Sequence, residues 1–360
     1  MRVRVPEFRG AAHDERVTVR IGLWLGVSFG ICFLTGLLSH FAQRGSYWPS
    51  APADLYRITQ GVHVVSGVAS VPLLLAKLWS VYPKLFGRPL VRSLPHALER
   101  ASILVLSGAA FFEVVTGLFN VAQNYVWGFG FVEAHHTVAW VAIGSVLVHV
   151  AVKLPVVRRG LSRLDREPAP VLSRRQFLRS TWLATGVAVV ATAGATVPAL
   201  RDVSVLSWRS ARGPQGVPVN RTARAAGVTE VDDTWRLTVG MREFSLAELR
   251  ALPQSTETLP IACVEGWSQS ATWTGVPVAD LLRLAGVAPG ARVRVSSLEE
   301  RGAYRTSELP GTHSDDPRTL LALRLNGEVL SPDHGYPCRL IAPSRPGVLQ
   351  TKWVTRLEVA

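Results

Sequence analysis

Five apolar runs in the first 200 residues constrain the fold more than any other feature of the sequence. Each is about 20 residues long, the length that a helix needs to cross a bilayer, and they lie near residues 21–42, 59–80, 101–120, 134–154 and 182–200. Basic residues fill alternate connecting segments, because 18 of the 20 lysines and arginines of residues 1–200 lie in 1–20, 77–100 and 153–181. The positive-inside rule then places the N-terminus in the cytoplasm. Five crossings leave residues 201–360 outside, which predicts a multi-pass protein of a bacterial inner membrane with an extracytoplasmic C-terminal part.

Composition argues against a nucleic-acid partner. The formal net charge is +13, and 48% of the residues are hydrophobic. The basic excess lies between the apolar runs instead of forming one basic face, so it indicates membrane topology. The three cysteines, Cys32, Cys263 and Cys338, are too scattered for a disulfide framework or a metal-clip spacing.

The fifth run has a basic preface, SRRQFLRS at 173–180. This stretch resembles the twin-arginine export signal, with Ser173 before the pair Arg174–Arg175. That resemblance implies export of a domain already folded around its cofactor, and the alternative is a plain basic flank of a stop-transfer segment. The small residues of ATAGA at 191–195 suit signal cleavage, so the sequence leaves open whether the outer part stays attached.

Histidines inside the apolar runs are candidates for function, because a histidine that faces lipid is costly. His135 and His149 are fourteen residues apart on the fourth run, which places them on one helix face roughly 21 Å apart. His63 should lie at a depth similar to His135, so the pair could hold one b-type haem between two imidazoles. The alternative is a polar contact between packed helices. His40 is a further candidate ligand for the haem iron. The alternative is that its side chain extends to the membrane interface.

This half of the chain resembles the four-span cytochrome b subunits of formate dehydrogenase and nickel hydrogenase. In that family the fourth-span histidines have the same fourteen-residue spacing, and one of them pairs with the second span. The family's first-span histidine is absent, since this chain has Gly22 and Leu23 in VRIGLWLG. The resemblance implies one haem b at His63 and His135 and leaves His149 without an obvious partner for a second.

From about residue 230 the pattern becomes that of a soluble α+β domain. Alternation predicts strands at 234–240 and 291–297, and helical periodicity predicts helices at 245–252 and 276–286. LALRLNGEVL at 321–330 has a hairpin turn at Asn326–Gly327. YPCRLIAP and KWVTRLEV predict the last strands. LPIAC predicts a strand that ends at Cys263, which on residue type alone is either a site residue or a buried structural cysteine.

Two separated motifs resemble the sulfite oxidase superfamily over roughly residues 215–360. They are C-V-E-G-W-S with W-T-G-V-P-V-A-D-L-L, and D-H-G-Y-P-C-R-L-I-A-P followed by K-W at 352–353. The resemblance implies that the Cys263 thiolate binds molybdenum, and a soft thiolate suits such a metal. It also implies that Mo-molybdopterin is held by Asn220, Arg221, Ser297, His334, Arg339, Gln350, Thr351 and Lys352. Cys338 has no family role and is expected to pack in the core.

Together the resemblances imply a four-helix haem bundle at 1–160, a basic linker with a fifth anchoring span at 161–205, and a molybdopterin domain at 206–360. The function expected is a membrane-bound oxidoreductase that passes electrons from quinol through haem b to molybdenum. It would reduce a small-molecule or protein-bound S- or N-oxide. Glu265 would repel sulfite, yet a sulfite dehydrogenase with reverse electron flow stays an alternative. A membrane haem sensor without enzyme activity is a second.

Overall fold

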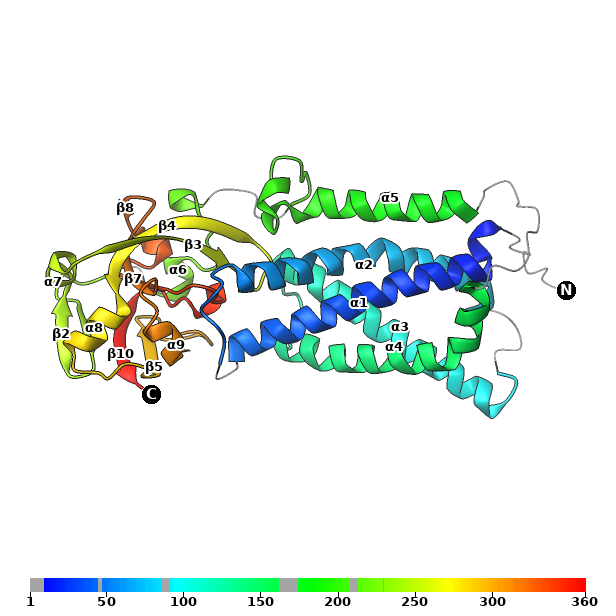
Figure 1. The fold of residues 1–360 in the computed structure, drawn as a ribbon, viewed down its shortest axis with the longest axis horizontal. Helices are drawn as coiled ribbons and strands as arrows, with labels where there is room; N and C mark the ends of the chain where they lie inside the picture. Colours follow the sequence, from blue (N-terminus) through cyan, green and yellow to red (C-terminus); the bar gives the residue numbers. More distant parts are fainter. Residues whose placement is uncertain (1–9, 45–46, 86–90, 162–173, 208–212, 229) are drawn as a thin grey trace. The chain divides into compact units, whose positions relative to one another are not determined.

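The computed structural model describes residues 10–44, 47–85, 91–161, 174–207, 213–228 and 230–360 (Figure 1). It contains two compact units. The first, here the helical unit, holds 1–37, 62–194 and 202–207. The second, here the outer unit, holds 38–61, 195–201 and 208–360. The short connection between the first two long helices is therefore part of the outer unit.

Four helices carry the first four apolar runs, and the described residues contain these four as candidate membrane spans: α1 (Glu15–Arg44), α2 (Leu55–Leu85), α3 (Leu94–Val121) and α4 (Phe131–Leu161). The expectation for these spans is confirmed. Many of their large apolar side chains are exposed, including Val27, Leu34 and Leu147. Exposed apolar surface of this extent marks a surface that another apolar phase covers, and lipid is the phase that helices of this length suit.

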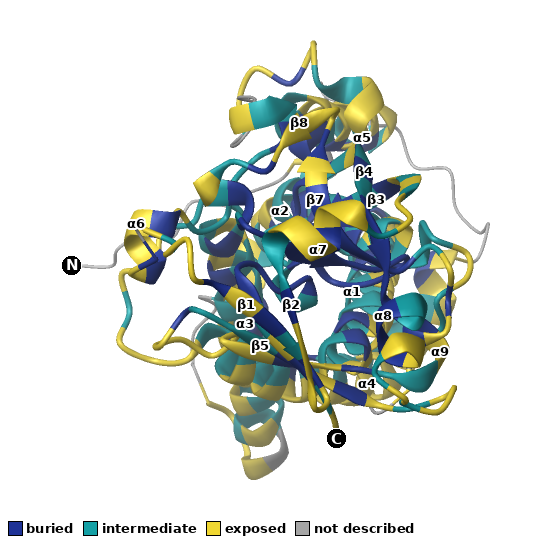
Figure 2. Cartoon of the chain, turned by 90° about the vertical axis from the view of Figure 1, so that its left-hand side faces the viewer, coloured by how far each residue is buried: buried dark blue, intermediate teal, exposed yellow. Residues whose placement is uncertain are grey.

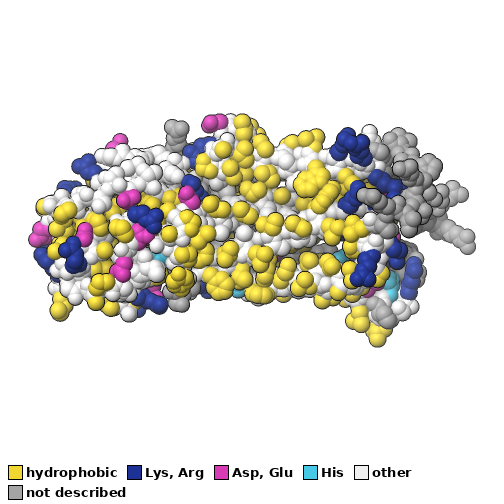
Figure 3. Space-filling model, viewed as in Figure 1, with side chains coloured by type: hydrophobic (Ala, Val, Ile, Leu, Met, Phe, Trp, Pro, Cys, Tyr) yellow, Lys and Arg dark blue, Asp and Glu magenta, His cyan; other side chains and the backbone are white. Residues whose placement is uncertain are grey.

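Neighbouring helices of the helical unit run in alternating directions. The Lys77 ammonium near the end of α2 donates to the carbonyl of Thr18 near the start of α1, at 2.9 Å. Glu99 near the start of α3 pairs with Lys153 near the end of α4. Lys and Arg side chains gather at this end of the helical unit, and hydrophobic side chains cover the helices beyond it (Figure 3). The basic segments of the sequence thus meet at one end of the helices.

The fifth expected span needs a correction. Its helix, α5, covers Arg174–Thr192, and residues 193–200 form two short 3-10 turns, Ala193–Ala195 and Pro198–Leu200. The helix includes the basic preface from Arg174 onward, so its apolar part is shorter than expected, and α5 is not among the four candidate spans of the described residues. Ser173 of the preface lies outside the described residues. Inside the helical unit, α5 runs parallel to α1, since Arg174 pairs with Asp14 at 2.8 Å and the rings of Trp182 and Trp24 lie 4.7 Å apart.

Two sheets form the domain of the outer unit. The first has the order β2-β1-β10-β5-β6, with β1 (Arg236–Val239) parallel to β10 (Val354–Val359) and the other pairs antiparallel. Its remaining strands are β2 (Arg242–Ser245), β5 (Val293–Ser297) and β6 (Thr306–Leu309). The second has the order β3-β4-β7-β8, with β9 also on β7, and its strands are β3 (Ser255–Ala262), β4 (Ser268–Pro277), β7 (Leu320–Leu325), β8 (Glu328–Val329) and β9 (Arg339–Ile341).

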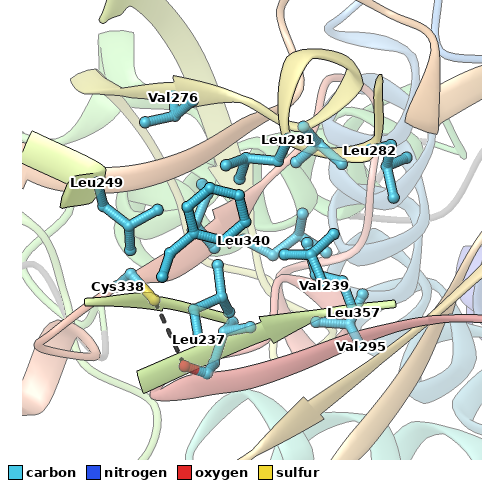
Figure 4. Packing of buried hydrophobic residues seen from close by; sticks show 14 of the residues in the cluster. Leu237, Val239, Leu249, Val276, Leu281, Leu282, Val295, Cys338, Leu340 and Leu357 are labelled. Atoms are coloured by element: carbon cyan, nitrogen blue, oxygen red, sulfur yellow. Dashed lines mark hydrogen bonds between the residues drawn. The ribbon is translucent and has the colours of Figure 1, made fainter. Parts of the chain in front are cut away.

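Strand β7 of the second sheet is buried on both faces. Successive side chains of a strand point to opposite sides, so its residues enter two different clusters. Leu321 and Leu323 of β7 pack in the main core with residues of the first sheet, whereas Leu320 and Ala322 pack in a second cluster that contains Cys263. Figure 2 shows the exposed strand β8 in yellow, whereas five of the six residues of β7 are buried. Figure 4 shows the main core, where the Cys338 thiol donates to the carbonyl of Val354 at 3.4 Å. Cys338 is a packing residue, as expected.

Most elements expected in this domain are confirmed. The helices are α7 (Leu246–Ala251) and α8 (Val278–Leu284), and the terminal strands fall where the alternation placed them. Asn326 and Gly327 have φ of 51° and 85° between the antiparallel strands β7 and β8, as a two-residue hairpin turn requires. Strands β2, β4 and β6 were not expected.

Candidate functional site

The Cys263 turn, residues 263–267, joins β3 to β4. The Cys263 amide donates to the carbonyl of Trp267 at 2.9 Å, and the Gly266 amide donates back to the carbonyl of Cys263 at 3.0 Å. Gly266 has a φ of 92°, which a residue with a side chain rarely adopts. The glycine of C-V-E-G-W-S thus closes the turn, and the turn fixes Cys263 at the end of the strand, as the sequence predicted.

Cys263 lies between apolar and cationic neighbours. It is 1% exposed and belongs to the cluster that contains Ile261, Trp267 and Trp273. The charged side chains of Arg339 and Lys352 also interact with it electrostatically. Cationic neighbours favour the thiolate, which is the form that binds metals.

Arg339 and Lys352 are buried cations that form no ion pair with any carboxylate among the described residues. Arg339 is 2% exposed, and burial lowers its pKa to about 10 although Cys263 opposes the shift. Its guanidinium lies over the Trp273 ring at 5.4 Å, and its Nη1 is 3.5 Å from the carbonyl oxygen of His334. The Lys352 ammonium donates to the carbonyls of Arg221 and Asp333, both at 2.8 Å, and burial, followed by the charge of Arg339, lowers its pKa well below the usual value. Burying two unpaired cations is costly, so their placement favours an anionic ligand.

Several buried polar atoms of the same region lack a hydrogen-bond partner among the described residues: His334 Nδ1, Arg339 Nε and Gln350 Oε1. His334 uses its other ring nitrogen, Nε2, which lies 2.8 Å from the carbonyl oxygen of Pro214. Burial, with the charge of Arg339 second, lowers the pKa of His334 to about 4, which leaves the ring neutral at pH 7. Each unpaired buried group costs about 1–3 kcal/mol. A ring system with a phosphate, such as molybdopterin, offers both acceptors for the cations and partners for the neutral groups, so these residues fit the group.

The other predicted cofactor residues form hydrogen bonds or ion pairs with neighbouring residues of the domain. The Ser297 hydroxyl donates to the carbonyl of Lys352 at 2.8 Å, and the Thr351 hydroxyl lies 2.7 Å from that of Ser307. Arg221 pairs with Glu299 at 2.7 Å, and the Asn220 carbonyl oxygen accepts from the Arg221 amide at 3.0 Å.

Two residues of the region were not among the predicted site residues. Asp333 accepts the Lys352 ammonium through its carbonyl and the amide of Ala223 through its carboxylate, at 2.8 Å each. Trp273 supplies the aromatic face under Arg339. Both residues lie inside the two motifs quoted above. This position is the sequence signal that could have identified them as site residues.

In the helical unit, the structure brings His63 and His135 together. Their ring centroids are 6.3 Å apart and the ring planes meet at 78°. Metal–imidazole bonds are about 2.0–2.1 Å long, so two rings that share one iron have centroids roughly 6 Å apart. The Nδ1 atom of His63 lies 2.9 Å from the carbonyl oxygen of Cys32, and that of His135 lies 2.9 Å from the Thr116 hydroxyl. A bond at Nδ1 orients a histidine so that Nε2 is the atom left for a metal.

Two further contacts surround this histidine pair, and the second of them competes with a metal ion for His135. A Cβ added at Gly36 would lie 3.0 Å from the His63 ring, so a glycine lets α1 approach the ring closely. The Nε2 atom of His135 lies 3.1 Å from the Glu113 carboxylate, which an iron would have to displace. The two histidines fit a bis-imidazole haem by distance and orientation.

The other two haem-iron candidates have different surroundings. His149 is half-buried on α4, and the charged groups that act on it are Lys77, Lys153 and Glu99. His40 makes an edge contact with Phe41, with ring centroids 6.5 Å apart.

A buried histidine outside the cysteine region makes the outer unit sensitive to acid. His313 is 1% exposed, and burial, with the charge of Arg345 second, lowers its pKa to about 4. An unfolded histidine titrates near 6.5, so the unfolded chain binds more protons between pH 6.5 and 4, and the free energy of unfolding falls as the pH falls through this window. We expect His313→Asn to reduce this loss by up to about 3 kcal/mol. Denaturant unfolding of the detergent-solubilised protein, followed by tryptophan fluorescence at pH 7 and 4.5, measures it. An unchanged loss in the variant would contradict the assignment.

Comparison with known proteins places the cysteine region in a known class. The family model "Oxidoreductase molybdopterin binding domain" matches residues 225–360. Mitochondrial sulfite oxidase of Drosophila melanogaster is 31% identical over 144 residues, which cover 33% of this chain and 25% of the relative. Sulfite oxidase of Arabidopsis thaliana is 29% identical over 151 residues, which cover 33% of this chain and 38% of the relative.

A further relative carries a different name. The "Putative protein-methionine-sulfoxide reductase subunit YedZ1" of Azospira oryzae is 35% identical over 117 residues, 32% of this chain and 43% of the relative. The chain thus covers less than half the length of each of these three relatives. The molybdenum-dependent oxidoreductases are the enzyme class that these relatives support, and the match to the oxidoreductase molybdopterin-binding family model covers residues 225–360.

Proposed function

We propose that this protein is a membrane-bound oxidoreductase that takes electrons from quinol through one haem b and reduces an S- or N-oxide at molybdenum outside the membrane. The observation that carries the proposal is the pair of buried, unpaired cations next to the Cys263 thiol. The similarity to two sulfite oxidases and a putative sulfoxide reductase subunit supports chemistry at a sulfur–oxygen bond.

Different residues of the protein would hold different parts of the cofactor. Arg339 and Lys352 would bind the anionic pterin end, His334 and Gln350 would hydrogen-bond its polar atoms, and the Cys263 thiolate would bind the metal. When bound, molybdopterin supplies oxygen-atom transfer in two-electron steps. For an S-oxide the balance is one sulfoxide plus two electrons and two protons giving one sulfide and one water, and one quinol supplies both electrons and both protons.

The contacts inside each unit support an extracytoplasmic cofactor domain. The segment between α1 and α2 packs on this domain, since the Trp48 indole donates to the carbonyl of Ser344 at 2.7 Å. The positive-inside rule places the end of α1, and with it this segment, on the outer side of the membrane. Four crossings return the chain to the inner side, so the proposal requires α5 to cross as well, although it is not among the four candidate spans of the described residues. Its 19 residues span about 28 Å, it runs parallel to α1, and its arginines start it at the basic end. We propose that these arginines, beginning with Arg174 and Arg175, also act as the twin-arginine signal.

The His63–His135 pair supports the proposed haem. Its centroid distance of 6.3 Å suits two imidazoles on one iron. With His149 placed among lysines and a glutamate, we propose one haem per chain. Quinol is the partner that lipid-soluble two-electron chemistry next to a membrane haem suggests.

The alternative function is a sulfite dehydrogenase that sends electrons the other way. The identity to two sulfite oxidases favours it. Glu265 argues against it, because this residue follows Cys263 by two positions and its carboxylate accepts from the Trp267 indole at 3.1 Å. A carboxylate next to the site would repel a sulfite anion.

One experiment separates the two directions. The protein is purified in detergent with its cofactors, molybdenum and haem are counted per chain, and the haem is followed by its optical spectrum. We expect one molybdenum and one haem, reduction of the haem by quinol, and reoxidation when methionine sulfoxide or an amine N-oxide is added. Haem reduction by sulfite would establish the alternative direction. Protein with haem and no molybdenum would refute both.

The cation pair yields a prediction with two opposed effects. We expect Arg339→Met to lower the molybdenum content at least about 10-fold, because loss of a group that supports a metal site costs roughly 10- to 100-fold in affinity. In the cofactor-free protein the same change should leave the outer unit at least as stable, because it removes a buried cation that has no carboxylate partner. Metal analysis and denaturant unfolding measure the two effects.

The matched control is Arg236→Met. Arg236 lies on β1, is exposed, and donates only to the nearby carbonyls of Thr234 and Trp235. It should keep the full molybdenum content. A destabilised Arg339→Met protein with normal molybdenum would contradict an anion-binding role for Arg339.

A further inference from the structure

Residues 47–61, which comprise the connection after α1 and the first turns of α2, belong to the outer unit and pack on the cofactor domain. Trp48 is 8% exposed, and its indole donates to both the carbonyl and the hydroxyl of Ser344, at 2.7 and 3.0 Å. The Ser344 amide donates in return to the carbonyl of Ala53 at 2.9 Å. The Arg57 guanidinium reaches the Ser270 hydroxyl of β4 at 2.8 Å. Four hydrogen bonds along one short segment make it a fixed part of the domain.

One residue of this segment touches the Cys263 turn itself. The side-chain amide of Gln60 donates to the carbonyl of Val264 at 3.1 Å, and Gln60 is 6% exposed. Val264 follows Cys263 directly in the chain, within the turn that the Cys263 and Gly266 amides close. Gln60 therefore joins the first turns of α2 to the backbone next to the thiol.

Gln60 is also one helical turn from His63. Residues three apart on a helix lie on the same side, with Cβ atoms about 5–6 Å apart. A short path of covalent bonds and one hydrogen bond thus runs from His63 along α2 to the Gln60 amide, across to the Val264 carbonyl, and on to Cys263.

We propose that the Gln60–Val264 hydrogen bond is the link through which electrons pass between the haem ligand His63 and the metal ligand Cys263. Gln60 is a positioning residue in this scheme, since it touches neither cofactor. The inference rests on the proposed function, because it needs both a haem and a molybdenum site. A haem iron exchanges one electron at a time, so the link is used twice for each oxide that is reduced to product and water.

The test compares Gln60→Leu with Gln43→Leu in the full-length, cofactor-loaded protein. Leucine keeps most of the side chain's volume and removes the donor. Gln43 lies near the end of α1, and its amide bonds only within its own helix, to the carbonyl and hydroxyl of Ser39 at 3.2 Å. Three properties are measured: molybdenum and haem content, the rate at which methionine sulfoxide reoxidises quinol-reduced haem in a stopped flow, and oxide reduction driven by a dye that reduces molybdenum directly.

We expect Gln60→Leu to keep both cofactors, to keep dye-driven reduction within twofold, and to reoxidise its haem at least tenfold more slowly. Gln43→Leu should match the unsubstituted protein in all three. Unchanged haem reoxidation in Gln60→Leu would overturn the inference. An equal loss of dye-driven reduction and haem reoxidation would also overturn it, because it would mean that Gln60 only shapes the molybdenum site. Absence of haem or molybdenum from the unsubstituted protein would refute the proposed function instead.

Discussion

Cys263→Ser protein should fold, keep its haem, and lose oxide reduction by more than the roughly 10- to 100-fold that follows loss of a group supporting a metal ligand. The serine is nearly the same size and leaves the turn's backbone hydrogen bonds in place. Its hydroxyl is a hard and weakly acidic donor, however, whereas a soft metal centre selects a thiolate. Dye-driven oxide reduction measures the loss directly at the outer unit. The optical spectrum of the haem shows whether the rest of the protein is intact.

Cys338→Ser is the matched control for this change. Cys338 is as buried as Cys263, at 0% against 1% exposure, but it lies in the main core with its thiol donating to the Val354 carbonyl. A serine hydroxyl retains that donor, so we expect activity and molybdenum content close to those of the unsubstituted protein. If Cys263→Ser retained full activity, or if both variants lost it equally, Cys263 would not be the metal ligand.

His135→Leu should abolish quinol-driven oxide reduction and the haem spectrum together, while the dye-driven reaction continues. The variant removes one of two imidazoles whose centroids lie 6.3 Å apart, and one axial ligand does not hold a bis-imidazole haem. Leucine is tolerated by an apolar helix surface, so the bundle should still assemble. We expect quinol-driven turnover below about 1% of normal, in line with loss of an essential redox group. Haem content per chain and the two activities are the measurements.

The neighbouring His136→Leu provides the control. His136 is one residue away on α4, its ring packs edge-on against Trp140, and it points about 100° away from His135 around the helix. This variant should retain haem and quinol-driven turnover. Retention of haem in His135→Leu protein would contradict the ligand assignment and would direct attention to His149 or His40.

Much of the layout was predictable because single residue patterns decide it. About twenty predominantly apolar residues with few charges leave a chain few alternatives to a spanning helix, so α1 to α4 were predicted correctly. The fifth helix was misplaced because arginine is a good helix former. Helix α5 therefore began inside its basic preface, at Arg174, and the run was broken before Pro198. Strand β4 was missed although residues 271–274 alternate in burial, because its last two residues fall in the helix predicted at 276–286.

The site was predictable only as a set of residues, not as an arrangement. Two motifs named Cys263, His334, Arg339 and Lys352, but burial and the absence of carboxylate partners came from the fold. The contact between Gln60 and Val264 joins residues 204 positions apart, and the Trp48–Ser344 contact spans 296. No local pattern encodes such pairings, because they arise from the packing of complete elements.

The embedding of residues 47–61 in the outer unit has a consequence for how this protein could be divided. A protease that cut at the small residues 191–195 would sever the covalent tether, yet Trp48 and Gln60 would still hold the catalytic piece to the membrane. A gene fragment beginning at residue 206 would encode the domain without residues 47–61. The contacts of Trp48 with Ser344 and of Gln60 with Val264 would then be missing. Two separate polypeptides could replace this chain only if the membrane polypeptide retained residues 47–61 and bound the C-terminal polypeptide through them.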